Sequence, residues 1–135
     1  MSKKILFVCK HNRFRSKVAE MFFNKFNKNK NYVAIGAGLL PGGYHLDKVQ
    51  VKVAKEFGIK LSGKPKPITT GLLRKINTLV IVADNVPSEI FQSKKYGLQE
   101  YRWEIKDVVR CDEEEVRESI SRIEKKVKEF VKELK

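Results

Sequence analysis

The sequence predicts an α/β fold in which helices cover both faces of a four-stranded parallel sheet, a doubly wound arrangement. Four short segments with strand patterns alternate with segments of helical periodicity, and they are residues 5–8, 32–35, 78–83 and 99–103. The third is an almost unbroken apolar, β-branched run, which is typical of a strand covered on both faces. A chain of 135 residues suits one domain, so we expect a single domain over residues 1–135.

The first strand, residues 5–8, is apolar, and a helix is expected over residues 16–27 because apolar side chains recur there at helical spacing. These side chains are Val18, Ala19, Phe22, Phe23 and Phe26. The second strand, residues 32–35, is expected to end at the Gly-Ala-Gly sequence of residues 36–38. Residues 39–44, which include Pro-Gly-Gly, are expected to form a loop.

The second helix is expected to begin after Asp47 and to end near Gly58. Asp47 can accept a hydrogen bond from an N–H group of the first turn, and glycine suits the residue that ends many helices. The apolar residues between them form one stripe, Val49, Val53, Ala54 and Phe57. The next helix is short, with Thr69 or Thr70 as its cap and residue 76 as its end.

The last two helices flank the fourth strand, residues 99–103. Asp84 or Asn85 is expected to cap the first of them, with Pro87 in its first turn. Asp112 is expected to cap the last helix, because a glutamate follows it three residues later in the pattern of a capping box. The apolar residues of this helix keep one register, Val116, Ile120, Ile123, Val127, Phe130, Val131 and Leu134.

The formal charge of +13 is unevenly distributed along the chain. Residues 1–30 hold nine Lys and Arg and one acid, whereas residues 111–135 hold seven and eight. The excess near the N-terminus can steer a phosphorylated substrate, and a lysine-rich solvated surface explains it equally well. Nucleic acid is not an expected partner, because the sequence contains no zinc-ligand spacing, helix-turn-helix signature or basic stripe interleaved with aromatic residues.

The N-terminal residues and the cysteines predict a soluble, cytoplasmic protein. The apolar run before Lys10 is too short for a signal-peptide core or a membrane span, so no membrane partner is expected. The two cysteines, Cys9 and Cys111, are far apart in the sequence, which fits a reducing compartment better than a disulfide framework. The oligomeric state stays open.

The loop between the first strand and the first helix is the candidate active site. Cys9 ends the strand and Arg15 lies at the start of the helix, so backbone N–H groups and the positive end of the helix dipole face one point outside the sheet. An anion can bind at this point. The same groups favour the thiolate form of Cys9. We therefore expect a nucleophile and a phosphate-binding loop of Lys10, His11, Asn12, Arg13, Phe14, Arg15 and Ser16.

Cys111 and Arg117 repeat the spacing of Cys9 and Arg15 in an unfavourable context. Residues 112–115 are all acidic, and their carboxylates would repel a phosphate and hold the thiol protonated. No apolar run precedes Cys111. The context therefore rejects this second match.

The carboxyl ends of parallel strands lie at one edge of such a sheet, where ligands bind. The first strand delivers Cys9 to this edge, and the fourth delivers residues 104–107. Three aromatic residues can either wall the site or pack in the core, and they are Tyr44, Tyr101 and Trp103.

Several motifs resemble the low-molecular-weight protein tyrosine phosphatases and the arsenate reductases of the same fold, in one order along nearly the whole chain. They are a strand ending in Cys-x5-Arg-Ser, Ala-Gly and Pro-Gly within residues 37–42, Gly-Ile at residues 58–59, and an aspartate before the last helix. The resemblance implies that Cys9 is the nucleophile, Asn12 stabilises the loop, Arg15 clamps phosphate and Ser16 supports the thiolate. It also implies that Asp107 is the general acid. An exposed loop carboxylate, or a partner for Arg110, is the alternative for Asp107.

Three positions differ from the family pattern. His11 stands where a glycine is usual, so the loop must accommodate a side chain. Val108 replaces the proline that usually follows the acid. Phe14 occupies a position where several members have a second cysteine near the nucleophile, and this difference argues against arsenate reduction.

The resemblance implies a phosphatase that needs no metal and no cofactor. Cys9 would attack phosphorus to form a phosphocysteine, Arg15 and the loop would hold the oxygens, and Asp107 would serve as acid and then as base. The expected substrate is a phosphorylated protein or a small aryl phosphate. Arsenate reduction, phosphoryl transfer without hydrolysis and phosphate binding without turnover stay open as alternatives.

Overall fold

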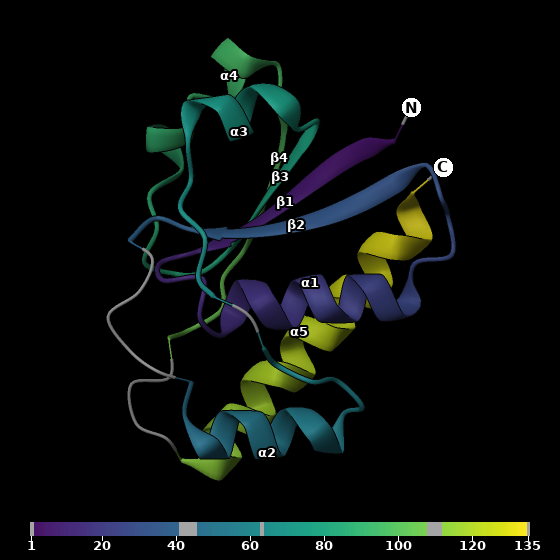
Figure 1. Ribbon diagram of the computed structural model, residues 1–135, viewed down its shortest axis with the longest axis vertical. Helices are drawn as coiled ribbons and strands as arrows, with labels where there is room; N and C mark the ends of the chain where they lie inside the picture. Colours follow the sequence, from purple (N-terminus) through teal and green to yellow (C-terminus); the bar gives the residue numbers. More distant parts are fainter. Residues whose placement is uncertain (1, 41–45, 63, 108–111, 135) are drawn as a thin grey trace.

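The computed structural model describes residues 2–40, 46–62, 64–107 and 112–134. Within these ranges, four parallel strands form one sheet in the order β2-β1-β3-β4, with helices on both faces (Figure 1). This arrangement confirms the predicted doubly wound α/β fold. Most of the loop predicted at residues 39–44 lies outside the described residues, as do Val108 and Cys111.

The two central strands are β1 (Lys3–Cys9) and β3 (Thr78–Val82). Every residue of β3 is buried, because side chains on both faces of a central strand meet packed helices. The edge strands are β2 (Tyr32–Gly38) and β4 (Gln99–Trp103). All pairs are parallel, so the carboxyl ends of the strands lie along one edge of the sheet.

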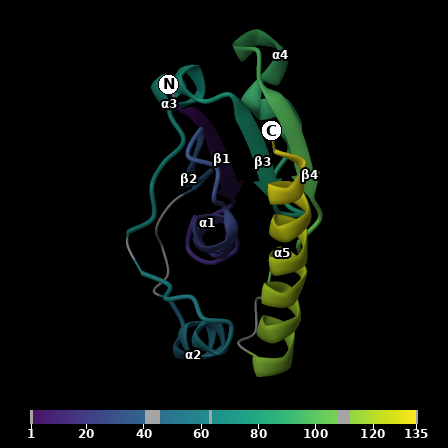
Figure 2. The same cartoon turned by 90° about the vertical axis from the view of Figure 1, so that its right-hand side faces the viewer.

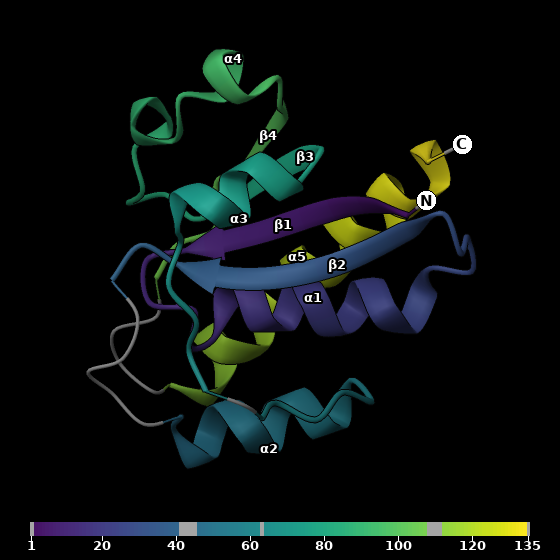
Figure 3. The ribbon, with the colours of Figure 1, turned by 45° about the horizontal axis from the view of Figure 1, so that its top comes forward.

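Helices of very different length cover the two faces. One face carries α1 (Arg15–Phe26) and α5 (Glu113–Glu133), with α2 (Lys48–Glu56) beyond them (Figure 2). The other carries α3 (Thr70–Lys75), and the 3-10 helix Ser88–Phe91 and α4 (Ser93–Tyr96) lie on the same side (Figure 3). Each face has its own apolar cluster, and the larger lies beneath α1 and α5.

The predicted caps of three helices are confirmed. Asp47, Thr69 and Asp112 each accept a hydrogen bond from a backbone N–H group of the first turn, at 2.8, 3.0 and 2.9 Å. Asp47 also forms a full capping box with Gln50. Such caps satisfy N–H groups that have no partner inside the helix, which is why the sequence pattern located these ends.

The predicted end of the second strand is wrong, because β2 continues through residues 36–38. Its two glycines are needed for space. A Cβ atom on Gly38 would lie 2.6 Å from the backbone nitrogen of Asn12, and one on Gly36 would lie 2.5 Å from Oε1 of Glu20. These glycines therefore allow close approach of the strand to the loop after β1 and to helix α1.

The helix predicted after Asp84 or Asn85 is also wrong. Only the 3-10 helix Ser88–Phe91 and the short α4 follow, and no side chain caps the 3-10 helix. Asp84 and Asn85 instead make hydrogen bonds to Arg15, at the carboxyl edge of the sheet. A residue that competes for a nearby charged donor does not also cap a helix.

Candidate active site

Cys9 ends β1 at the carboxyl edge of the sheet and is only 2 % exposed. Its sulfur accepts a hydrogen bond from the backbone N–H of Asn12 at 3.2 Å, and Oγ of Ser16 lies 3.1 Å from it. Phe14 precedes α1 without a side-chain cap, so the first N–H groups of the helix are left for a ligand. The sulfur thus contacts one backbone N–H and one hydroxyl group of the loop.

Asn12 fixes the conformation of this loop. Its backbone is left-handed, with φ of 52°, a conformation that asparagine tolerates better than most residues. Its Nδ2 donates to Oγ of Ser16 at 2.6 Å, and its Oδ1 accepts from the backbone N–H of Lys66 at 2.9 Å. Because the Ser16 oxygen accepts from Asn12, the hydroxyl hydrogen is available to the Cys9 sulfur.

Arg15 is held between the loops that follow β3 and β4. Its Nη1 donates to the carbonyl of Ile105 at 2.9 Å and lies 3.5 Å from Oδ1 of Asp84. Its Nη2 donates to Oδ1 of Asn85 at 3.0 Å and lies 3.7 Å from Oδ2 of Asp107. The guanidinium, whose side chain is 3 % exposed, is thus oriented by four acceptors at the same edge as Cys9.

Asp107 lines one hollow together with Cys9 and Arg15. The other lining residues are His11, Arg13 and Phe14. The Asp107 side chain is 35 % exposed, so it has access to both solvent and the hollow. The structure therefore brings together the three predicted catalytic residues, whereas Glu104 is exposed and forms an ion pair with Arg102.

The loop accommodates His11 by using its side chain. Nδ1 of His11 donates to the carbonyl of Leu40 at 2.9 Å, and the backbone N–H of Leu40 donates to the carbonyl of Lys10 at 2.7 Å. The N–H of Leu39 also donates to the carbonyl of Cys9 at 3.1 Å. His11 thus joins the loop to the end of β2, which glycine could not do through a side chain.

The chain matches the low molecular weight phosphotyrosine protein phosphatase family model over residues 4–135. It belongs to this family.

Solved structures agree with this assignment of the fold. The low molecular weight protein tyrosine phosphatase of T. tengcongensis has 24% sequence identity, a TM-score of 0.84, and coverage of 98% of this chain and 100% of that one. An arsenate reductase from Archaeoglobus fulgidus has 26% identity, a TM-score of 0.73 and coverage of 96% and 99%. The arginine phosphatase YwlE from Geobacillus stearothermophilus has 18% identity, a TM-score of 0.80 and coverage of 96% and 91%.

Two of the aromatic residues considered for the wall of the phosphatase site lie in the core instead. Trp103 is 6% exposed and packs against Phe7 and Phe130, and Tyr101 contacts Phe130 edge-on. Both side chains lie on the face of β4 that α5 covers. Tyr44, the third candidate, lies outside the described residues.

A buried lysine, Lys17, lies behind the loop with the half-buried Glu20 near it, and sequence reasoning missed it. Burial lowers the pKa of Lys17 and raises the pKa of Glu20, and in each case it is the largest effect. Lys66 lowers the pKa of both groups, whereas Lys17 and Glu20 each favour the charged form of the other. Sequence periodicity could not reveal this burial, because Lys17 lies outside the apolar stripe of the helix.

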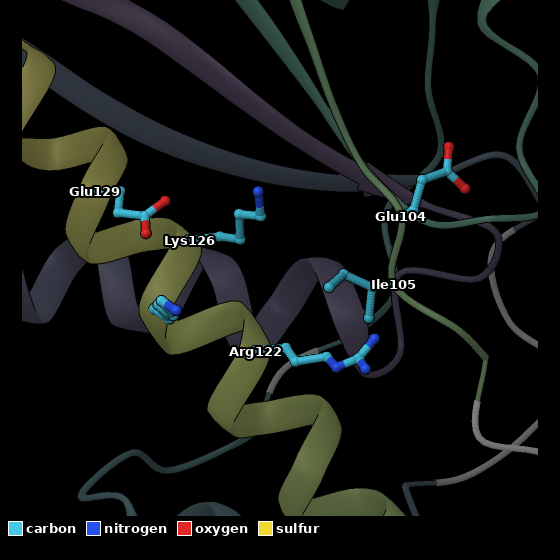
Figure 4. Close-up of a pocket in the computed structure, with 6 residues that line it drawn as sticks. Glu104, Ile105, Arg122, Lys126 and Glu129 are labelled. Atoms are coloured by element: carbon cyan, nitrogen blue, oxygen red, sulfur yellow. The ribbon is translucent and has the colours of Figure 1, made fainter.

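A second hollow of about 280 Å³ lies between α5 and the end of β4 (Figure 4). Arg122 reaches from the helix toward Ile105, while Glu104 points away from it. Arg122 also pairs with Glu118 at 3.2 Å. The residues that line this hollow include no cysteine or serine.

Neither a metal centre nor a membrane span is evident in the described part of the chain. Within residues 2–40, 46–62, 64–107 and 112–134, no three His, Cys, Asp or Glu side chains are grouped so that they could hold a metal ion. In the same ranges, no helix combines the length and the apolar character that crossing a bilayer requires.

Proposed function

We propose that this protein hydrolyses phosphomonoesters of the phosphotyrosine type through a phosphocysteine intermediate. The observation that carries the proposal is the position of Cys9 at the carboxyl end of β1, with Asn12, Ser16 and the first turn of α1 around its sulfur. A thiolate in such surroundings is a strong nucleophile. Family membership supports phosphatase chemistry of this kind.

In the first step, the Cys9 thiolate attacks phosphorus in line with the bond to the leaving oxygen. An S–P bond forms, the P–O bond breaks, and the electron pair of that bond leaves with the phenolate oxygen. Asp107, in its protonated form, donates a proton to this oxygen. Loop N–H groups and Arg15 stabilise the charge on the equatorial oxygens.

Arg15 is suited to this role because its planar fork can bind two phosphate oxygens at once. Asp84, Asn85 and the Ile105 carbonyl hold the guanidinium in place before the substrate arrives. Such preorganisation means that little rearrangement is needed as charge develops.

In the second step, Asp107, now a carboxylate, takes a proton from a water molecule that attacks phosphorus. The P–O bond to water forms, the S–P bond breaks, and Cys9 leaves as a thiolate. Inorganic phosphate is released and Asp107 is protonated again, so the cycle closes without an added oxidant or reductant. The proposed substrate is a phosphorylated protein or a small aryl phosphate.

The direct test is hydrolysis of para-nitrophenyl phosphate and phosphotyrosine without added metal. We expect turnover that chelator does not reduce, competitive inhibition by phosphate or vanadate, and complete loss in Cys9→Ser. Undiminished activity of Cys9→Ser would contradict the proposal. A phosphocysteine that accumulates and does not hydrolyse would instead support a phosphoryl carrier, and phosphate binding without any turnover would support a binding module.

Arsenate reduction is the second candidate, because an arsenate reductase shares 26% sequence identity with the chain. That chemistry requires a second thiol to attack the oxidised nucleophile. Cys111 is the only other cysteine of the sequence, and four acidic residues follow it. We therefore expect arsenate to cause little or no thiol consumption, and rapid consumption that is lost in Cys111→Ser would favour the reductase instead.

A further inference from the structure

Lys17 is a buried cation in the first turn of α1, directly after Ser16. It is 5% exposed, and its Nζ donates to the backbone carbonyls of Ser62 and Lys64, both at 3.3 Å. Lys25, on the same helix, is exposed and donates to the carbonyl of Phe57 at 2.9 Å. A buried ammonium group is costly unless it has partners, so the position of Lys17 calls for an explanation that Lys25 does not need.

The partners of Lys17 connect it to the catalytic loop. Two residues after Lys64, the N–H of Lys66 donates to Oδ1 of Asn12 at 2.9 Å. The carbonyl of Lys66 accepts from the N–H of Gly38 at 2.8 Å. The segment that binds the Lys17 ammonium group therefore also holds the side-chain amide of Asn12, which in turn orients the Ser16 hydroxyl toward Cys9.

Lys17 also interacts electrostatically with the charged groups around it. The groups that affect the pKa of Lys17 are Glu20 on its own helix, Lys66 on the neighbouring chain and Cys9 at the end of β1. Burial and Lys66 lower that pKa, whereas Glu20 and ionised Cys9 raise it. Lys17 and Cys9 therefore interact electrostatically, in addition to the hydrogen bonds that connect Lys17 to the loop.

We propose that Lys17 is a positioning residue of the catalytic loop. It secures Asn12 through the chain at Ser62 and Lys64, and so keeps the Asn12 N–H and the Ser16 hydroxyl at the Cys9 sulfur. The proposal rests on the proposed function for its effect on turnover alone, since the reactivity of Cys9 can be measured without any substrate. The Lys17 ammonium group does not touch the reacting atoms, because it donates to the backbone carbonyls of Ser62 and Lys64.

The first experiment measures the rate at which iodoacetamide alkylates Cys9 between pH 5 and 9, in a Cys111→Ser background. We expect Lys17→Met to react about three- to tenfold more slowly than the parent at pH 6.5, because the Asn12 N–H and the Ser16 hydroxyl are then held less firmly at the sulfur. Lys25→Met is the matched control, because it removes a lysine from the same helix, and its profile should equal that of the parent. A parental profile in folded Lys17→Met would overturn the proposal.

The second experiment does not require a variant at Lys17. The NMR signals of the Lys17 side chain are followed against pH in the wild-type protein and in Cys9→Ser, a nearly isosteric change. Loss of the thiolate should lower the pH at which Lys17 loses its proton, while the Lys25 titration stays unchanged. Identical Lys17 titrations in the two proteins would mean that Lys17 and the nucleophile do not interact, and would overturn the proposal even if Lys17→Met does not fold.

These readouts separate the proposal from the proposed function. If the alkylation profile moves in Lys17→Met but no aryl phosphate is hydrolysed by the parent, the role of Lys17 stands and the phosphatase activity is wrong. If hydrolysis depends on Cys9 and the alkylation profile does not move, the phosphatase activity stands and the role of Lys17 is wrong.

Discussion

Two arginines, Arg15 and Arg117, follow a cysteine at the same spacing in the sequence, and their surroundings differ in kind. The Arg15 side chain is 3% exposed and has acceptors from two loops, including Asp84 and Asp107. The Arg117 side chain is 40% exposed and pairs with Glu56 and Glu113 on helix surfaces. Shielding from water strengthens the interactions of a charge and fixes its direction, whereas exposed pairs contribute little.

The comparison teaches that a charge becomes useful for chemistry where the fold buries it with partners and leaves one side open to a ligand. Arg15 meets this condition, because the hollow in front of it is lined by Cys9 and Asp107. Arg117 makes three hydrogen bonds to carboxylates, but it lies on the outside of α5 with no nucleophile beside it among the described residues.

The largest expected effect concerns the carboxylate partners of the two arginines. Asp107→Asn should slow hydrolysis of phosphotyrosine by about 10²–10⁴-fold, the range typical of a general acid, while a substrate whose phenolate leaves easily is spared. The measurement is a series of aryl phosphates of rising leaving-group pKa. Glu56→Gln, which alters a partner of Arg117, should match wild type, and so should Glu104→Gln. If the rates of Asp107→Asn and wild type depend equally on the leaving-group pKa, Asp107 is not the general acid.

The next effect compares the arginines themselves. Arg15→Lys keeps the charge but loses the fork that binds two oxygens, so kcat/KM for aryl phosphates should fall by about 10²–10³-fold. Arg117→Lys should stay within about twofold of wild type, because the Arg117 side chain is exposed and its partners are surface carboxylates. A near wild-type rate in Arg15→Lys would mean that Arg15 acts through its charge alone and not by binding two oxygens.

A smaller loss of activity is expected when a residue that only orients Arg15 is changed. Asn85→Ala removes one hydrogen bond to the guanidinium, while the bond to the Ile105 carbonyl persists. Its kcat/KM should fall by about three- to tenfold, the size of one ordinary hydrogen bond, because the remaining partners still orient the guanidinium. Thr69→Ala is the control: loss of this helix cap should cost about 1 kcal/mol of unfolding free energy and leave kcat/KM unchanged. Equal activities of the two variants would mean that Asn85 does not position Arg15.

The smallest effect concerns stability at the surface. A hydrogen bond from Arg117, followed by the charge of Lys52, lowers the pKa of Glu113 below its ordinary 4.5. A depressed pKa stabilises the folded state above the pKa of the unfolded chain, and this contribution is lost as pH falls through the lower, folded value. Arg117→Gln should therefore destabilise the protein slightly at pH 7 and less at pH 3, and salt should weaken the effect. Chemical denaturation at both pH values measures it, and a larger loss at pH 3 would exclude this pair as the cause.

The difference between the predicted and observed helix after β3 has a clear physical origin. Asp84 and Asn85 follow a buried strand and have side chains that commonly cap helices, so local sequence favoured a cap. In the fold they face Arg15, which lies 69 and 70 residues away in the chain. A charged donor at the sheet edge is a stronger partner than a backbone N–H group, and no local pattern reveals that it is near.

The two glycines at the end of β2 illustrate the same limit. Glycine is a common strand breaker in sequence analysis, and Gly36 and Gly38 were expected to end the strand. The strand continues because it pairs with β1 through Gly38. Glycine is required at Gly38, where a Cβ atom would clash with the backbone of Asn12. Close approach of segments that are distant in sequence is a property of the packed molecule alone.

The sequence by itself determined most of the elements and the place where the candidate site residues meet. Hydrophobic periodicity set the strands and helices, capping residues set three helix starts, and the strand–Cys–loop–helix order directed a nucleophile and N–H donors to one point, because these features are local in the chain. Only the tertiary structure decided which side chains hold Arg15 and Asn12, that Trp103 packs in the core, and that Lys17 is buried behind the loop. These outcomes depend on contacts between residues far apart in sequence, where burial and competition among partners select one arrangement.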